Sequence, residues 1–248
     1  MPDAIALFSL RLIVGMAFVC LALARPGFGV VSPFFRILML LLLGLAVLGG
    51  LASAGGDQLA ALLLAVACFV GSIFWLLERR TWGLYSLGVA LMVGLYWMSR
   101  ILYVQAANGT IPLPVLIVAT LASAATLGTA LCGMLLGHRY LTAPGMPLAP
   151  LFLANQLLGA AAVVRLIVSL AALAWFHAAL TQPTWWIWLS LRWLAGIAGP
   201  LAVWFMVRKI LVFRNTQSAT GVLFVGVILT FIGELTGDLL FRTLGAPF

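Results

Sequence analysis

The side chains of this sequence best placed to do chemistry are charged residues inside otherwise apolar stretches. Glu234, Asp238 and Arg242 stand four residues apart, so on a helix they share one face. Four further arginines interrupt apolar stretches elsewhere: Arg11, Arg100, Arg165 and Arg192. A charge inside a bilayer is costly and normally faces the bundle interior with a partner. We therefore expect the two carboxylates to meet arginines inside the fold.

Two interpretations of this charged cluster remain open. In one it is an ion-pair network that locks a helix bundle, and arginines near helix ends, Arg100 and Arg242, reach the headgroups. In the other it lines a polar cavity for a quinone, a lipid headgroup or an anion. The candidate ligand-binding residues are then Glu234, Asp238, Arg11, Arg165 and Arg192. No residue is predicted to be catalytic, because we find no nucleophile with a base.

The two histidines do not form a haem or metal site. His138 ends the fifth apolar stretch and His177 ends the sixth, about 40 Å apart along a helix. They cannot share one b-type haem within the chain, so no haem is predicted. Cys20, Cys68 and Cys132 stand in apolar runs without a CxxC motif, so no metal site is predicted either.

A second group of candidates lies at the predicted inner face. It consists of His138, Arg139 and Arg214. A polar run follows Arg214, where Thr216 or Ser218 can cap the last helix. The N-terminus of that helix can also hold an anionic group.

Composition places all of these residues in a membrane. The chain has 248 residues, of which 65% are hydrophobic and only 7% charged, whereas soluble domains carry about 25% charged residues. A soluble enzyme, a disordered chain and a coiled coil are excluded. The net charge of +8 is concentrated at the ends of apolar runs, which indicates membrane orientation rather than a nucleic-acid partner.

The apolar runs are continuous and long enough to cross a bilayer as helices. We predict an all-α polytopic transmembrane bundle forming one membrane domain over residues 1–248, with connections too short for a soluble domain. The eight predicted spans are 4–24, 35–54, 59–77, 82–104, 113–136, 150–176, 185–207 and 219–241.

Basic residues alternate between the two ends of these spans. The connections after spans two, four and six hold no Lys or Arg, and those after the odd spans hold eight: Arg25, Arg36, Arg79, Arg80, Arg139, Arg208, Lys209 and Arg214. The positive-inside rule then predicts that both termini are outside, in the periplasm of a bacterial inner (plasma) membrane. The charged cluster falls in the outer half or near the midplane.

Two weaker patterns accompany the spans. The tryptophans crowd near predicted interfaces, typical of an aromatic belt; examples are Trp75, Trp82 and Trp97. Ser9-Leu10-Arg11 with Gly15 resembles Ser190-Leu191-Arg192 with Gly196, which suggests a parallel repeat.

The stretch from Ile228 to Phe241, with Gly233-Glu234-Leu235-Thr236-Gly237 at its centre, resembles the last helix of a known family. That family comprises the quinol-interacting membrane anchors of molybdopterin reductases, the dimethyl-sulfoxide and polysulfide reductase anchors. The resemblance covers about 15 of the 248 residues. It implies quinol binding without a haem, a peripheral iron–sulfur partner subunit, and a role for Glu234. The family's arginine has no match in this helix, because Asp238 stands nearby and Arg242 is displaced.

These observations favour a membrane subunit of a respiratory electron-transfer complex that interacts with quinone or lipid and has no redox centre of its own. Whether such a subunit counts as an enzyme is left open. The alternatives are a structural accessory subunit that packs against other membrane chains, and a small secondary transporter. Against a transporter, only Gly199-Pro200 suggests a broken helix.

Overall fold

The protein is a bundle of long helices, with no strand among the residues that the structure describes. The computed structural model describes residues 2–53, 57–109, 111–143 and 145–247. Within them, eight helical segments are long and apolar enough to cross a membrane, which confirms the polytopic all-α prediction. The helices are α1 (Pro2–Leu23), α2 (Ser32–Ala52), α3 (Gln58–Leu76), α4 (Arg80–Ala107), α5 (Leu113–Thr142), α6 (Ala149–Phe176), η1 (His177–Ala179), α7 (Pro183–Trp193), η2 (Leu194–Ala198), α8 (Gly199–Val212) and α9 (Thr216–Leu244).

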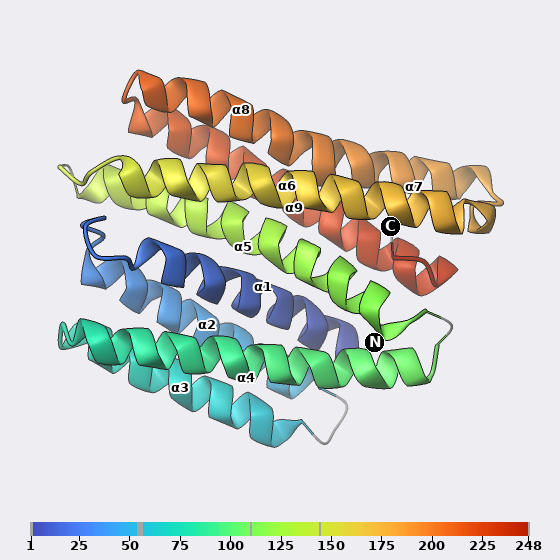
Figure 1. The fold of residues 1–248 in the computed structure, drawn as a ribbon, viewed down its shortest axis with the longest axis horizontal. Helices are drawn as coiled ribbons and strands as arrows, with labels where there is room; N and C mark the ends of the chain where they lie inside the picture. The colour runs from blue at the N-terminus through green and yellow to red at the C-terminus, as the bar shows by residue number, and fades with distance from the viewer. Residues whose placement is uncertain (1, 54–56, 110, 144, 248) are drawn as a thin grey trace.

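The helices run nearly parallel or antiparallel and divide into two packed groups (Figure 1). Helices α1 to α4 form one group, in which α1 packs against both α2 and α4. Helices α5 to α9 form the other, and α1 joins the two by packing along α5. The consecutive helices α4 and α5 touch only sparsely. The join between the groups therefore rests mainly on the α1–α5 contact.

Glycines set the spacing at this contact. A Cβ added to Gly15 of α1 would stand 1.9 Å from the carbonyl oxygen of Ala124 in α5. A Cβ on Gly128 would likewise meet the backbone of Gly15. Without side chains at these positions the two backbones approach closely, as small residues allow between membrane helices.

Several helices are longer than the predicted spans. Helix α5 has 30 residues and α9 has 29, which corresponds to about 45 Å at about 1.5 Å per residue. The hydrocarbon core is only about 30 Å thick, so these helices extend into the headgroup layers. Hydropathy alone marks the apolar middle of a helix and underestimates its ends.

The seventh span is continuous despite Gly199-Pro200. Helices α7 and α8 are joined by the π-helical turn η2, in which the Gly199 N–H donates to the Leu194 carbonyl oxygen five residues earlier. Pro200 has no N–H and its ring crowds the preceding turn, so widening that turn avoids the clash. The sequence correctly places an irregularity here, but as a wide turn rather than a break.

Two of the tryptophans assigned to an aromatic belt are core residues instead. Trp75 and Trp97 are both fully buried. The Trp75 ring stacks on Phe35 with centroids 4.4 Å apart, and Gly83 leaves room for its indole. Trp82 is exposed as a belt residue would be. The prediction was wrong for the first two because glycines on facing helices open indole-sized spaces that the sequence does not pair.

Candidate functional site

Glu234 lies at the centre of a buried polar cluster. Its carboxylate accepts two hydrogen bonds from Arg165, Nε to Oε1 at 3.1 Å and Nη2 to Oε2 at 3.2 Å. Arg192 Nη2 donates to Oε1 at 3.0 Å and Ser123 Oγ to Oε2 at 2.6 Å. The side chain has no exposed surface. Four donors fill the acceptor sites of a carboxylate, so the Glu234 side chain is saturated with hydrogen bonds and clamps three neighbouring helices to α9.

The surrounding helices bring these groups to one level. Ser123 comes from α5, Arg165 from α6, Arg192 from α7 and Glu234 from α9. Glu234 is ten residues before the end of α9, about 15 Å along the helix. A Cβ on Gly233 would stand 2.1 Å from the Cα of Gly196. This close contact between η2 and α9 positions Arg192, four residues before Gly196, beside the carboxylate of Glu234.

A second ion pair lies one turn farther along α9. Arg11 Nη1 donates to Asp238 Oδ1 at 2.5 Å, with side-chain exposures of 10% and 20%. Arg11 Nε is buried and has no hydrogen-bond partner among the described residues. The convergence predicted for the five cluster residues is therefore confirmed, as two linked pairings on α9.

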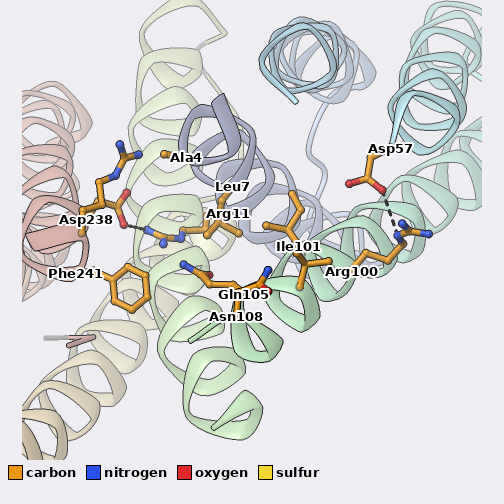
Figure 2. Close-up of a pocket in the computed structure, with 12 residues that line it drawn as sticks. Ala4, Leu7, Arg11, Asp57, Arg100, Ile101, Gln105, Asn108, Asp238 and Phe241 are labelled. Carbon is orange, nitrogen blue, oxygen red and sulfur yellow. Dashed lines mark hydrogen bonds and ion pairs between the residues drawn. The ribbon is translucent and has the colours of Figure 1, made fainter. Parts of the chain in front are cut away.

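A polar cavity of about 440 Å³ opens beside the Arg11–Asp238 pair. It lies at the end of the bundle that holds both termini, here called the termini end (Figure 1). In Figure 2, Gln105 and Asn108 extend from α4 below Arg11, and the Phe241 ring faces them from α9. The apolar part of the wall includes Leu7, Ile101 and Val104.

The opposite rim of the cavity carries another ion pair. Arg100 Nε of α4 lies 3.2 Å from Asp57 Oδ1, at the start of α3 (Figure 2). Arg100 therefore has a carboxylate partner from the connection before α3, and half of its side chain remains exposed. Arg242 also lines the cavity and is exposed.

A smaller cavity of about 30 Å³ continues inward. It shares Leu7, Arg11, Gln105, Asp238 and Phe241 with the larger one. Its inner wall includes Ser123 and Arg165, which both bond Glu234. Of the five predicted ligand candidates, Arg11, Asp238 and Arg165 therefore line a cavity, whereas Glu234 and Arg192 form the base behind it.

Sequence reasoning missed the rest of the cavity wall. Gln105, Asn108 and Phe241 are ordinary residue types near a helix end, so nothing in the sequence marks them as part of a cavity wall. The Asp57–Arg100 pair had a usable signal. The two residues have opposite charge, and the connection that holds Asp57 and the end of span four near Arg100 are predicted on the same side.

The inner-face candidates lie at the opposite, basic end of the bundle, and none of them lines the cavities described above. His138 and Arg214 are exposed, and Arg139 Nη1 donates to Thr142 Oγ1 at 3.4 Å. The prediction that Thr216 or Ser218 caps the last helix was wrong, because the N-cap residue is Asn215. Asn215 caps α9 by accepting a hydrogen bond from the Ser218 N–H at 3.0 Å, since its short amide fits the N-cap position.

Within the described ranges, no three His, Cys, Asp or Glu side chains cluster as a metal site. His138 lies in the last turns of α5 and His177 follows α6, at opposite ends of the bundle. Comparison of the chain with protein-family models, curated proteins and solved structures gives no significant match.

The class of protein that fold and site define is an integral, helical membrane protein in contact with lipid, with a polar cavity at its termini end.

Proposed function

We propose that this chain is the quinone-binding membrane subunit of a respiratory electron-transfer complex in a bacterial plasma membrane. In this proposal the chain binds the quinone head and holds no redox centre. A peripheral iron–sulfur subunit at the termini end, which faces the periplasm, exchanges electrons with the quinone. The resemblance of the last helix to reductase anchors agrees with this assignment.

The observation that carries the proposal is the composition of the larger cavity. Quinone carbonyls accept hydrogen bonds, and Arg11, Gln105 and Asn108 offer donors on the cavity wall. Leu7, Ile101 and the Phe241 ring supply apolar surface for the ring itself. A mostly preformed pocket with a few converging polar groups is typical of a small-molecule site.

The Arg11–Asp238 pair suits the proton chemistry of a quinone. Two carboxylates lie on α9, Glu234 and Asp238. The Asp238 side chain is 20% exposed, whereas that of Glu234 is fully buried. A carboxylate beside a quinone head can accept or return a proton, provided that geometry allows direct or water-mediated contact. Glu234, with all four acceptor sites occupied, is unsuited to that exchange.

The second candidate function is a structural accessory subunit. The saturated Glu234 clamp favours it, because such a cluster locks helices together without any ligand. The two candidates differ in what they require of the cavity wall. Only the quinone subunit requires Gln105 to be polar.

The test is equilibrium binding of a benzoquinone without side chain to the purified chain in nanodiscs, read by tryptophan fluorescence quenching. Gln105→Leu removes one donor from the wall and leaves no buried charge behind. We expect the affinity to fall about tenfold, the loss of one hydrogen bond worth roughly 1.4 kcal/mol.

Gln217→Leu is the matched control, because Gln217 is exposed at the basic end. It should bind the benzoquinone as the unmodified chain does. Absence of binding by the unmodified chain, or equal binding by Gln105→Leu, would refute the quinone proposal and favour the accessory subunit.

A further inference from the structure

Helices α4 and α5 enclose a third cavity on the outside of the bundle. It has a volume of about 340 Å³ and its lining is almost entirely apolar. Met98 and Leu102 form a buried floor, and Tyr96 and Leu121 are exposed beside it. We call it the α4–α5 groove; it is lined by Met92, Leu95, Tyr96, Met98, Ser99, Leu102, Ile117 and Leu121.

The groove adjoins the polar cavities along both of its helices. On α4, Gln105 lines the two polar cavities and Leu102, one turn away, lines the groove. On α5, Leu116 lines the small cavity and its neighbour Ile117 lines the groove. Only about one helical turn separates the polar space from the apolar one.

Helices α4 and α5 also touch each other less than the neighbouring helix pairs do. The other consecutive spans of the first group pack along much of their length, whereas α4 and α5 touch sparsely. The opening of the groove faces lipid, because Tyr96 is 57% and Leu121 39% exposed on this side.

We infer that the gap between α4 and α5 is a lateral portal, and that the α4–α5 groove holds the isoprenoid or alkyl chain of a quinone whose head lies in the polar cavity. This inference rests on the proposed function and adds to it the class of quinone and its entry route. The head sits near the headgroup layer and the chain descends into hydrocarbon. The order polar cavity, narrow neck and apolar groove matches the order of parts in one long-chain quinone.

The experiment compares two probes on the same preparations in nanodiscs, with bound probe measured by its own absorbance after the nanodiscs are separated, because the variants add a tryptophan. One is the benzoquinone without side chain, and the other is the same ring bearing a ten-carbon alkyl chain, with concentrations expressed per lipid. Leu121→Trp places an indole in the groove. Leu62→Trp is the matched control, because Leu62 is 60% exposed on α3, away from the groove.

We expect Leu121→Trp to weaken binding of the long-chain probe about tenfold, or about 1.4 kcal/mol, and to leave the short probe unchanged. Leu62→Trp should affect neither. A second variant, Ile117→Trp, repeats the test from the other side of the groove, so poor folding of one variant does not decide the outcome.

The possible failures are distinguishable. If both probes bind and Gln105→Leu weakens both, but the groove variants change neither, the portal is refuted while the quinone site stands. If the chain binds neither probe, or Gln105→Leu has no effect, the proposed function itself fails and the portal fails with it.

Discussion

Glu234 and Asp238 show how two carboxylates one helical turn apart acquire different roles. Glu234 is fully buried and accepts four hydrogen bonds. Asp238 has one strong partner, Arg11, and lines both polar cavities. The environment rather than the residue type thus encloses the first carboxylate and leaves the second at a cavity wall.

Replacing Glu234 with Gln should destabilise the fold strongly. The amide would direct N–H groups at the guanidinium donors of Arg165 and Arg192, and two cations would lose their shared anion. Breaking one side of a buried ion pair costs about 3–5 kcal/mol. The measurement is thermal unfolding of the purified chain in detergent, where the transition should drop or the folded protein should fail to accumulate.

The control for Glu234→Gln is Arg208→Gln, which removes an exposed charge at the basic end. Exposed charges contribute about 0–1 kcal/mol, so this variant should unfold like the unmodified chain. Equal thermal stability of the two variants would contradict the clamp role of Glu234.

Ser123→Ala tests the one neutral member of the clamp. The variant loses a 2.6 Å hydrogen bond to the Glu234 carboxylate, and hydrogen bonds to charged groups are worth roughly 1.5–3 kcal/mol. We expect a smaller drop in unfolding temperature than for Glu234→Gln. Ser99→Ala, which removes an exposed bond to the Tyr96 carbonyl oxygen of its own helix, should have almost no effect, and a similar loss in both would argue against this bond.

The meeting of these charges was predictable, but the pairing was not. Spacing along the last helix and distance from the span ends place Glu234, Arg165 and Arg192 at a similar depth. Which arginine meets which carboxylate depends on how each helix is rotated about its axis. Packing contacts between helices set that rotation, and they cannot be predicted from hydropathy.

At the scale of elements, glycines decide which helices approach most closely. Gly15 meets Gly128 between α1 and α5, and Gly196 meets Gly233 between η2 and α9. In both cases an arginine stands four residues before the first glycine and donates to a carboxylate of α9. The similarity noted between the two Ser-Leu-Arg segments thus has a shared structural consequence, whatever its origin.

Gly15→Ala should separate α1 from α5. The new Cβ would stand 1.9 Å from the Ala124 carbonyl oxygen, and a backbone atom cannot yield as a side chain can. Overpacking typically costs about 1–3 kcal/mol, so the unfolding temperature should fall clearly in the same detergent assay.

Gly44→Ala is the matched control for Gly15→Ala. Gly44 is also inside a helix, but a Cβ there has nothing within 4 Å. Because Ala favours helix by about 1 kcal/mol over Gly, this variant should be neutral or slightly stabilised. If Gly15→Ala behaves like Gly44→Ala, the α1–α5 contact is not close-packed.

The span count was predictable because eight apolar runs are separated by polar or Pro- and Gly-containing connections. The wide turn η2 was predictable only in part. Pro200 marks a lost hydrogen bond, yet its remedy depends on Gly196 resting against Gly233 of another helix. A polar cavity beside the charged cluster was one of the two interpretations that the sequence allowed, but its full wall was not predictable, since it combines α1, α4 and α9.

Across the whole molecule, the larger cavity lies where the two helix groups meet. Helices α1 and α4 come from the first group and α9 from the second, and the Arg11–Asp238 pair bridges them. Any relative movement of the groups would change this cavity before it changed the cores. The Glu234 clamp joins α5, α6, α7 and α9 within the second group, so the cavity wall is tied to this cluster on one side only.

The orientation of the molecule can be tested through its ends. The basic end carries Arg25, Arg80 and Arg208 with their neighbours, whereas Asp57, Asp238 and Glu234 offset part of the positive charge toward the termini end. Since Lys and Arg remain on the cytoplasmic side, both termini should face the periplasm.

Two reporters fused after Phe248 test this orientation. A phosphatase that works only outside the cytoplasm should be active there, and a fluorescent protein that matures only in the cytoplasm should stay dark. The same pair of fusions after Arg79, at the end of the third span, should give the opposite result. A bright cytoplasmic reporter after Phe248 would invert the molecule and place the larger polar cavity, together with the quinone site proposed there, in the inner leaflet.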